Sequence, residues 1–141
     1  MAVYEIIRGD TYVLRRPLFR YELADLSLGP FNLTGCTIRT TWKVAPTPPA
    51  DDPSDTTGVL KGLLIVNGSG VATTEVNLFM IGPATDGVIE HRVTAAETAN
   101  LPLGVSWKSD VEVTDANNEV STFLFEGDTA KARDGYTNRL I

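Results

Sequence analysis

The chain has 141 residues, a formal net charge of -6 at pH 7 and a single cysteine. This length fits one domain with one core, and a single cysteine excludes an intramolecular disulfide. The acidic balance argues against a nucleic-acid partner, which needs clustered lysine and arginine, and no segment has the roughly 20 apolar residues of a membrane span.

The first residues predict two strands and then a bend. Residues 4–8 and 11–16 are rich in β-branched and aromatic side chains and are separated by a Gly-Asp turn. Pro17 cannot donate to a sheet ladder, so residues 18–23 form either a separate strand after a bend or an edge strand. We expect a loop over 25–30.

The clearest strand of the first half covers residues 36–44. Every second residue, Cys36, Ile38, Thr40, Trp42 and Val44, lies on one side, and this period of two predicts a strand with one buried face. Residues 45–57 then contain mainly proline, alanine, threonine, serine and aspartate. So little apolar surface predicts a mobile, exposed loop within the domain.

Two apolar runs, 58–66 and 71–81, flank Asn67-Gly68-Ser69-Gly70. Asparagine and glycine accept the positive φ of tight turns, so this stretch predicts a β-hairpin. A turn over 82–87 and a strand over 88–93 follow.

One short helix is expected near residues 94–100. Thr94 followed three residues later by Glu97 forms a capping box, in which the two side chains satisfy free N–H groups at a helix start. Pro102 and Gly104 end that helix.

A second hairpin is expected after the helix. Its first strand places Val105, Trp107, Ser109, Val111 and Val113 on one side, and residues 115–119 form the turn to a second apolar run. Trp107 and Trp42 share the apolar side of their strands. We therefore predict that both are core residues, each buried against the other's sheet, rather than a platform for sugars.

No catalytic or metal-binding arrangement emerges from these elements. His91, the only histidine, lies in the middle of a predicted strand. Asp115, Asn117, Glu119 and Glu126 match positions 1, 3, 5 and 12 of a calcium loop, but Val120 stands where that loop needs glycine, so a hairpin turn is favoured. We expect no enzyme activity and no cofactor.

The charge is unevenly distributed. Residues 1–43 carry a net charge of +2, residues 44–128 carry -10 and residues 129–141 carry +2. The last segment has few large apolar residues and weak periodicity, which predicts a C-terminal edge strand or a docking arm that lies on another subunit and can be deleted without unfolding the domain. The residues predicted to make contacts between chains are Arg15, Arg16, Lys131, Arg133, Tyr136, Arg139, Leu140 and Ile141.

Residues 1–128 are accordingly expected to form one all-β domain, an antiparallel β-sandwich, with residues 129–141 as the edge strand or arm. Four segments, together with their order along the chain, resemble the sequences of a known protein family. They are GDTY at 9–12, FNLTGCTI at 31–38, VTAAETANLPLG at 93–104 and WKSDVEVTD at 107–115.

In these segments the chain resembles small immunoglobulin-like β-sandwich proteins of tailed bacteriophages, including the N-terminal domain of baseplate upper proteins. The resemblance implies a virion structural protein, made in the bacterial host cytoplasm. It implies a minor tail or baseplate component, or alternatively a capsid decoration protein, whose partners are other virion proteins and copies of itself.

Two alternatives of other classes stay open. A carbohydrate- or receptor-binding module would need a solvent-exposed aromatic patch. A small enzyme would need a deep polar pocket around His91.

Overall fold

The computed structural model describes residues 3–22, 27–43, 59–104, 106–124 and 129–134, and this part of the chain is mostly β, as the sequence predicted. The strands are β1 (Val3–Ile7), β2 (Tyr12–Pro17), β3 (Phe19–Glu22), β4 (Ser27–Pro30), β5 (Thr37–Lys43), β6 (Val59–Val66), β7 (Ala72–Val76), β8 (Leu78–Ile81), β9 (Val88–Val93), β10 (Ser106–Thr114), β11 (Val120–Leu124) and β12 (Thr129–Arg133). The α-helix is α1 (Ala95–Thr98), and a single 3-10 turn, η1 (Ala84–Asp86), precedes β9.

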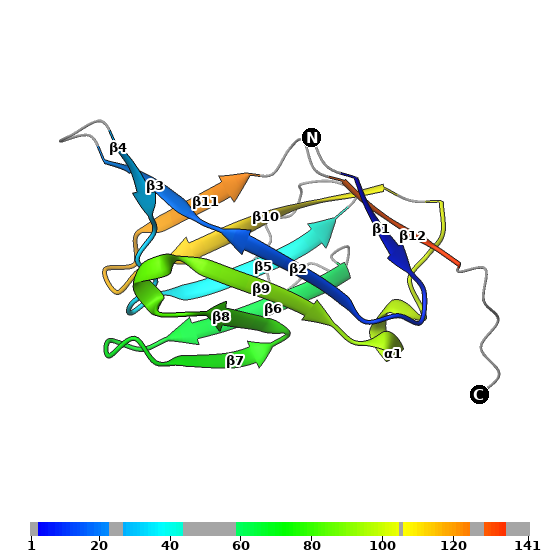
Figure 1. Cartoon of the computed structure of the whole chain (residues 1–141), viewed down its shortest axis with the longest axis horizontal. Coiled ribbons are helices and arrows are strands. Elements are labelled where there is room, and N and C mark those ends of the chain that lie inside the picture. The colour runs from blue at the N-terminus through cyan, green and yellow to red at the C-terminus, as the bar shows by residue number, and fades with distance from the viewer. Residues whose placement is uncertain (1–2, 23–26, 44–58, 105, 125–128, 135–141) are drawn as a thin grey trace.

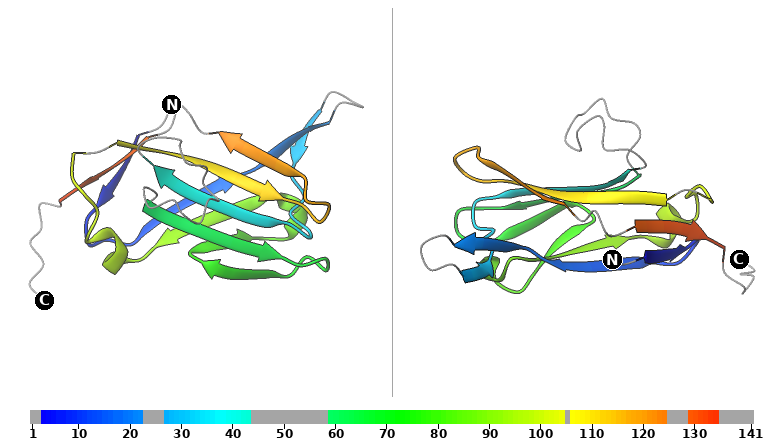
Figure 2. Two further views of the ribbon diagram at one scale, coloured as in Figure 1. Left: turned by 180° about the vertical axis from the view of Figure 1, so that it is seen from behind. Right: turned by 90° about the horizontal axis from the view of Figure 1, so that it is seen from above.

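Two layers of strands face each other across the core (Figure 1; Figure 2, right). The larger sheet has the order β1-β12-β10-β5-β6-β7, with β11 also paired to β10, and the smaller sheet has the order β2-β9-β8. A separate ribbon of β3 and β4 projects from one end (Figure 1). The larger sheet is mixed, because β1 and β12 run parallel, so the expectation of a purely antiparallel structure is wrong at this pair.

Alternation along β10 builds the inner face of the larger sheet. Trp107, Ser109, Val111 and Val113 are buried, while the residues between them are exposed or half-buried. Trp42 on the neighbouring β5 is also fully buried, so the assignment of both tryptophans to the core is confirmed. The two rings nevertheless come from one sheet, because Trp42 lies opposite Ser109 in the register of β5 and β10. The prediction that each packs against the other's sheet is therefore wrong.

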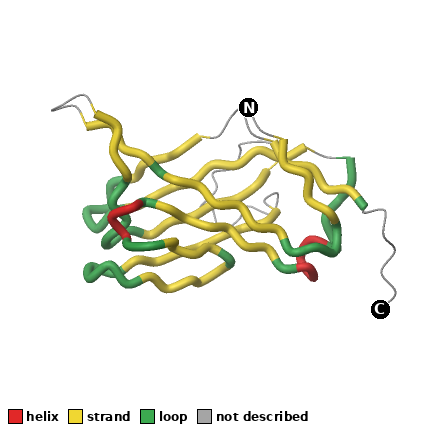
Figure 3. The backbone as a smooth tube through the Cα atoms, viewed as in Figure 1, coloured by secondary structure: helices red, strands yellow, loops and turns green. Residues whose placement is uncertain are grey.

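The tryptophans pack with residues of β1, β9 and the segment after α1. Ile6, Val93 and Leu101 belong to the same buried cluster. A second cluster, which includes Ile38, Leu64 and Val111 of the larger sheet with Ile89 and Leu78 of the smaller one, fills the other half of the interior. The two clusters together fill the space between the two layers, whose strands are yellow in Figure 3.

The β6–β7 hairpin forms where the sequence predicted it. The Asn67 side-chain oxygen accepts hydrogen bonds from the Ser69 and Val71 amides at 2.9 and 3.0 Å, and Gly70 has a φ of +79°. The apolar run that follows is two strands rather than one. Asn77, with a φ of +50°, separates β7 from β8, so the chain leaves the larger sheet and enters the smaller one.

The Thr94 half of the predicted capping box is present at α1, whereas the Glu97 carboxylate contacts side chains. The Thr94 hydroxyl oxygen accepts a hydrogen bond from the Glu97 amide at 3.2 Å, and the Glu97 carboxylate accepts from the Asn77 side-chain amide at 2.8 and 3.1 Å. Thr98, fully buried, donates to the Asp10 carbonyl at 2.7 Å and accepts from the Gly9 amide at 3.1 Å. The short helix is thereby fixed to the turn between β1 and β2.

Two other expectations concern loops. The predicted loop over 25–30 contains β4, which pairs with β3 from Ser27 to Pro30. The pattern was missed because glycine and proline weaken the strand signal, although a two-stranded edge ribbon tolerates them. The predicted mobile loop over 45–57 lies outside the described residues.

Residues 129–133 belong to the domain's own sheet. β12 lies between β1 and β10, with Ala130 opposite Trp107, and Ala130 and Ala132 are buried in the tryptophan cluster. The prediction of an edge strand or a dispensable arm is therefore wrong for this segment. Its alanines gave little hydrophobic signal because they are small, yet small side chains fit beside the indole rings.

Truncating either tryptophan tests the core. Trp42→Ala and Trp107→Ala should each lower the free energy of unfolding by about 3 to 5 kcal/mol, because a large cavity would remain in a shared cluster. Chemical denaturation measures the change, and Val120→Ala, at a residue 58% exposed, is the matched control with a change within about 0.5 kcal/mol. A tryptophan variant that unfolds at the parent's midpoint would contradict the core assignment.

Removing the cap tests the helix start. Thr94→Ala should lower the free energy of unfolding by about 0.5 to 2 kcal/mol, because the Glu97 amide loses its acceptor. Thr94→Ser keeps the hydroxyl and should stay close to the parent in the same urea titration. Equal losses in both variants would show that the hydroxyl is not what stabilises this turn.

Candidate interaction surface

The outer face of the smaller sheet carries the most organised polar cluster in the described part of the chain. Side chains alternate along β2 and β9, so Arg15 and Glu90 point away from the core and lie directly opposite each other. Phe79 of β8 pairs with Glu90 from the other side, and Arg92 pairs with Val13 two residues further along β9. We call Val13, Arg15, Phe79, Glu90 and Arg92 the arginine face.

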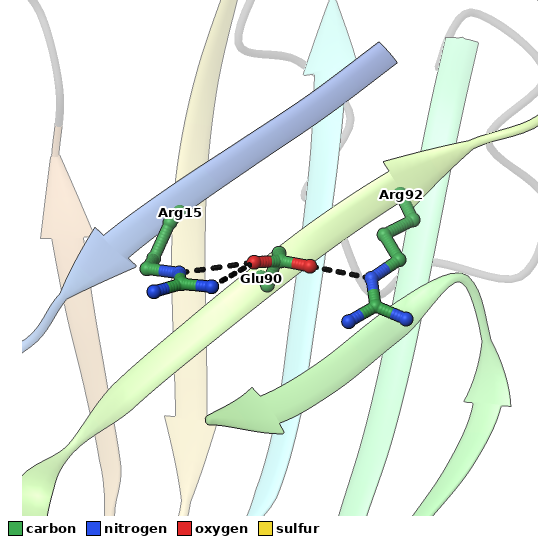
Figure 4. A network of polar contacts seen from close by, with 3 residues as sticks. All are labelled: Arg15, Glu90 and Arg92. Atoms are coloured by element: carbon green, nitrogen blue, oxygen red, sulfur yellow. Dashed lines mark hydrogen bonds and ion pairs between the residues drawn. The ribbon is translucent and has the colours of Figure 1, made fainter. Parts of the chain in front are cut away.

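One carboxylate holds two guanidinium groups on this face. The Arg15 Nε and Nη2 atoms donate to Glu90 Oε2 at 2.9 and 2.8 Å, and Arg92 Nε donates to Glu90 Oε1 (Figure 4). The Glu90 side chain is only 5% exposed although it lies on the outer face, because the arginines cover it. Hydrogen bonds to charged groups are short and strong, so the three side chains hold one another in place.

These contacts fix the charge of the cluster. The hydrogen bonds from Arg92 and then Arg15 hold the pKa of Glu90 below its usual value, and they outweigh burial, which acts in the opposite direction. Glu90 is therefore ionised at neutral pH. Two cations and one anion leave the cluster with a net charge of +1.

The arginines remain partly accessible. The Arg15 side chain is 60% exposed and that of Arg92 is 47% exposed. The Arg92 guanidinium lies 4.2 Å from the centroid of the Phe79 ring, a cation–π contact that adds to its fixed position. Val13 beside Arg92 is about half-exposed. The face thus offers two held cations next to apolar side chains.

Arg16, predicted to contact another chain, points the other way. It is buried on the inner side of β2, where Nη1 donates to the Ser109 hydroxyl at 2.7 Å and the guanidinium lies 5.1 Å from the Trp42 ring centroid. The prediction of an interface role for Arg16 is wrong. Adjacent residues of a strand face opposite sides, so Arg15 and Arg16 cannot share one surface.

The other predicted interface residues lie elsewhere. Lys131 is exposed on β12, and Arg133 donates to the Glu5 carboxylate at 2.9 Å, a contact within the chain. The structure does not bring either onto the smaller sheet that holds Arg15. Tyr136, Arg139, Leu140 and Ile141 lie outside the described residues. Their contact with another chain stays a prediction.

Sequence reasoning missed four members of the arginine face, which are Val13, Phe79, Glu90 and Arg92. A signal was present, because Glu90 and Arg92 flank His91 at alternating positions, and His91 was recognised as a strand residue. The register that brings Arg15 opposite Glu90 joins residues 75 positions apart, and no local pattern specifies it.

His91 lies on the inner side of β9 and is buried. Its Nε2 atom is 3.3 Å from the Lys61 carbonyl oxygen. Burial, with a smaller contribution from the charge of Arg16, lowers the pKa of His91 to about 4, so the ring is neutral at pH 7. The side chain is a core residue with a backbone partner.

The calcium-like pattern forms a turn. Asp115 Oδ1 accepts hydrogen bonds from the Asn117 and Glu119 amides at 2.8 and 2.9 Å, which closes the β10–β11 hairpin. Glu126 lies outside the described residues. Among the residues that are described, no group of three or more histidine, cysteine or acidic side chains could hold a metal ion, and no helix is long and apolar enough to cross a bilayer.

No protein-family model matches the chain, and no curated protein matches it in sequence. Its function is therefore argued from its own residues.

Acid should destabilise the protein in two windows. The folded pKa of His91 is about 4, below an unfolded value of about 6.5, so the unfolded chain binds the proton first and stability falls as the pH drops from about 6.5 towards 4. That loss reaches about 3 kcal/mol at about 1.4 kcal/mol per pKa unit. Glu90 also has a lowered pKa, so its contribution is complete above about 4.3 and is lost at lower pH.

Urea denaturation at a series of pH values separates the two groups. His91→Gln, which keeps a donor for the Lys61 carbonyl, should remove the loss in the upper window only. Glu90→Gln should cost about 1 to 2 kcal/mol at pH 7 and flatten the lower window. An upper window that persists in His91→Gln would contradict the assignment.

Proposed function

We propose that the chain is a non-enzymatic structural protein of a bacteriophage virion, a minor tail or baseplate component that assembles through protein–protein contacts. We also propose that its two facing layers form an immunoglobulin-like sandwich. Pairs of strands far apart in sequence, β2 with β9 and β5 with β10, support that proposal, because such long-range pairing is typical of sandwiches with Greek-key connections.

The observation that carries the proposal is how the four resembling segments contact one another. Segments 9–12 and 93–104 are joined by the two hydrogen bonds of Thr98. Segments 31–38 and 107–115 pair directly, with Ile38 opposite Val113. The four segments therefore lie in two adjacent pairs, which supports the view that they belong to one shared fold.

The arginine face supports an assembly role. It combines fixed, half-exposed arginines with apolar neighbours, and arginine and aromatic residues are the side chains that dominate protein interfaces. Sugar recognition through the tryptophans has less support, because Trp42 and Trp107 are both buried in the core.

The location of the gene product in particles tests the proposal. Antibodies raised against the purified chain should label the tail tip or baseplate of virions made by the bacterium that encodes it, as seen by electron microscopy. Particles from a strain that lacks the gene are the control. Label over the capsid would instead indicate the decoration protein, and purified particles that contain none of the chain by mass spectrometry would overturn the virion role.

A further inference from the structure

The arginine face carries more positive charge than its own carboxylate can neutralise. Glu90 accepts from both arginines, yet the cluster keeps a net charge of +1 on a chain whose total is -6. Arginine has five N–H donors, and here only Nε and Nη2 of Arg15 and Nε of Arg92 are directed at Glu90. The remaining donors, held in place by the shared carboxylate, suit another carboxylate.

Exposed apolar side chains lie near these arginines in the chain. Val13, which pairs with Arg92, is 51% exposed, and Phe19, which begins β3 two residues after the end of β2, is 49% exposed. Exposed ion pairs contribute only about 0 to 1 kcal/mol each, so a stable contact needs such apolar groups around the charges.

The chain carries a complementary acidic surface at one end. Four connecting segments meet there, because the Leu33 amide donates to the Ala84 carbonyl at 3.0 Å, the Gly35 amide donates to the Asn67 carbonyl at 3.0 Å, and a β-carbon at Gly35 would lie 3.5 Å from that of Ala116. These segments, residues 31–36, 67–71, 82–87 and 115–119, contain three acidic residues and no lysine or arginine. We call them the acidic end (Figure 1, left).

Two carboxylates of the acidic end are exposed, those of Asp86 and Glu119, whereas Asp115 is engaged in its own turn. Asp86 lies in η1, two residues before β9 begins. The ion pairs of Arg15 and Arg92 within this chain are with Glu90, and both arginine side chains stay about half-exposed. A carboxylate of another molecule can therefore approach the donors that Glu90 does not engage.

We infer that the arginine face of one copy binds the acidic end of the next copy, through Arg15 and Arg92 on one side and Asp86 and Glu119 on the other. The inference rests on the proposed function in that it names the partner of an assembling subunit. Because two different surfaces meet, the contact is head-to-tail, and its repetition gives a closed ring or an open filament. Its ion pairs weaken as salt rises.

Sedimentation equilibrium of the purified full-length chain tests the contact. The parent should associate at low salt, with a dissociation constant below about 1 mM, and should do so more weakly at higher salt. The face variant, Arg15→Gln with Glu90→Gln and Arg92→Gln, replaces the cluster with neutral amides and leaves no buried carboxylate unpaired. The end variant is Asp86→Asn with Glu119→Gln. Each should weaken self-association at least tenfold.

Mixing the two variants gives the decisive result. The face variant keeps its acidic end and the end variant keeps its arginine face, so an equal mixture should form heterodimers that do not extend further. Lys108→Gln, which removes one exposed cation on β10, is the matched control and should associate within twofold of the parent. Circular dichroism and thermal melting check that each variant is folded.

Three outcomes would overturn the inference. They are a parent that stays monomeric at about 1 mM in low salt, folded variants that associate like the parent, and a mixture no better associated than its components. Failure here is distinct from failure of the virion role. If the antibody labels particles but the purified parent is monomeric, the virion role is supported and the contact between copies is contradicted. If the parent associates but no particle is labelled, the contact is supported and the virion role is contradicted.

Discussion

Strand β10 is the element on which the larger sheet depends. One of its edges pairs with β5 along most of its length, and the other edge is shared between β11 and β12. Its inner face contributes Val111 and Val113 to one buried cluster and Trp107 to the other. Because β12 joins the sheet at Ser106 and Trp107, and β1 joins only through β12, both ends of the described chain are held by this strand.

Arg15 and Arg16 have different roles because successive side chains of β2 point to opposite faces of its sheet. Arg16 turns inward, where the Ser109 hydroxyl and the Trp42 ring compensate for part of the cost of burying a charge. Arg15 turns outward and covers Glu90. Sequence reasoning gave both residues the same interface role because it weighed their charge and not their side of the strand. A one-residue difference in position therefore separates a core contact from a surface contact.

Local chemistry made several elements predictable. The Thr94 cap, the Asn67 turn and the alternation of β10 each depend on residues within a few positions of one another. The path of the chain at Asn77 and the place of β12 depend instead on which distant strands pair, and no short window of sequence specifies that. The same distinction applies to the candidate surface. Arg15 was predicted from the sequence, whereas the roles of Glu90 and Arg92 depend on the pairing of β2 with β9.

The arrangement of charge along β9 gives the subunit a direction. Asp86 lies in η1, two residues before β9 begins, and Arg92 lies near the end of that strand, so a negative and a positive group are separated along this part of the chain. Complementary charges of this kind set the orientation and rate of an encounter more than its strength. In a contact between copies they would align one chain with the next, while Val13 and Phe19 supply apolar area that is insensitive to salt. In the proposed contact, the neighbouring copy supplies the carboxylate for the second arginine, since a single bidentate arginine is enough to neutralise Glu90.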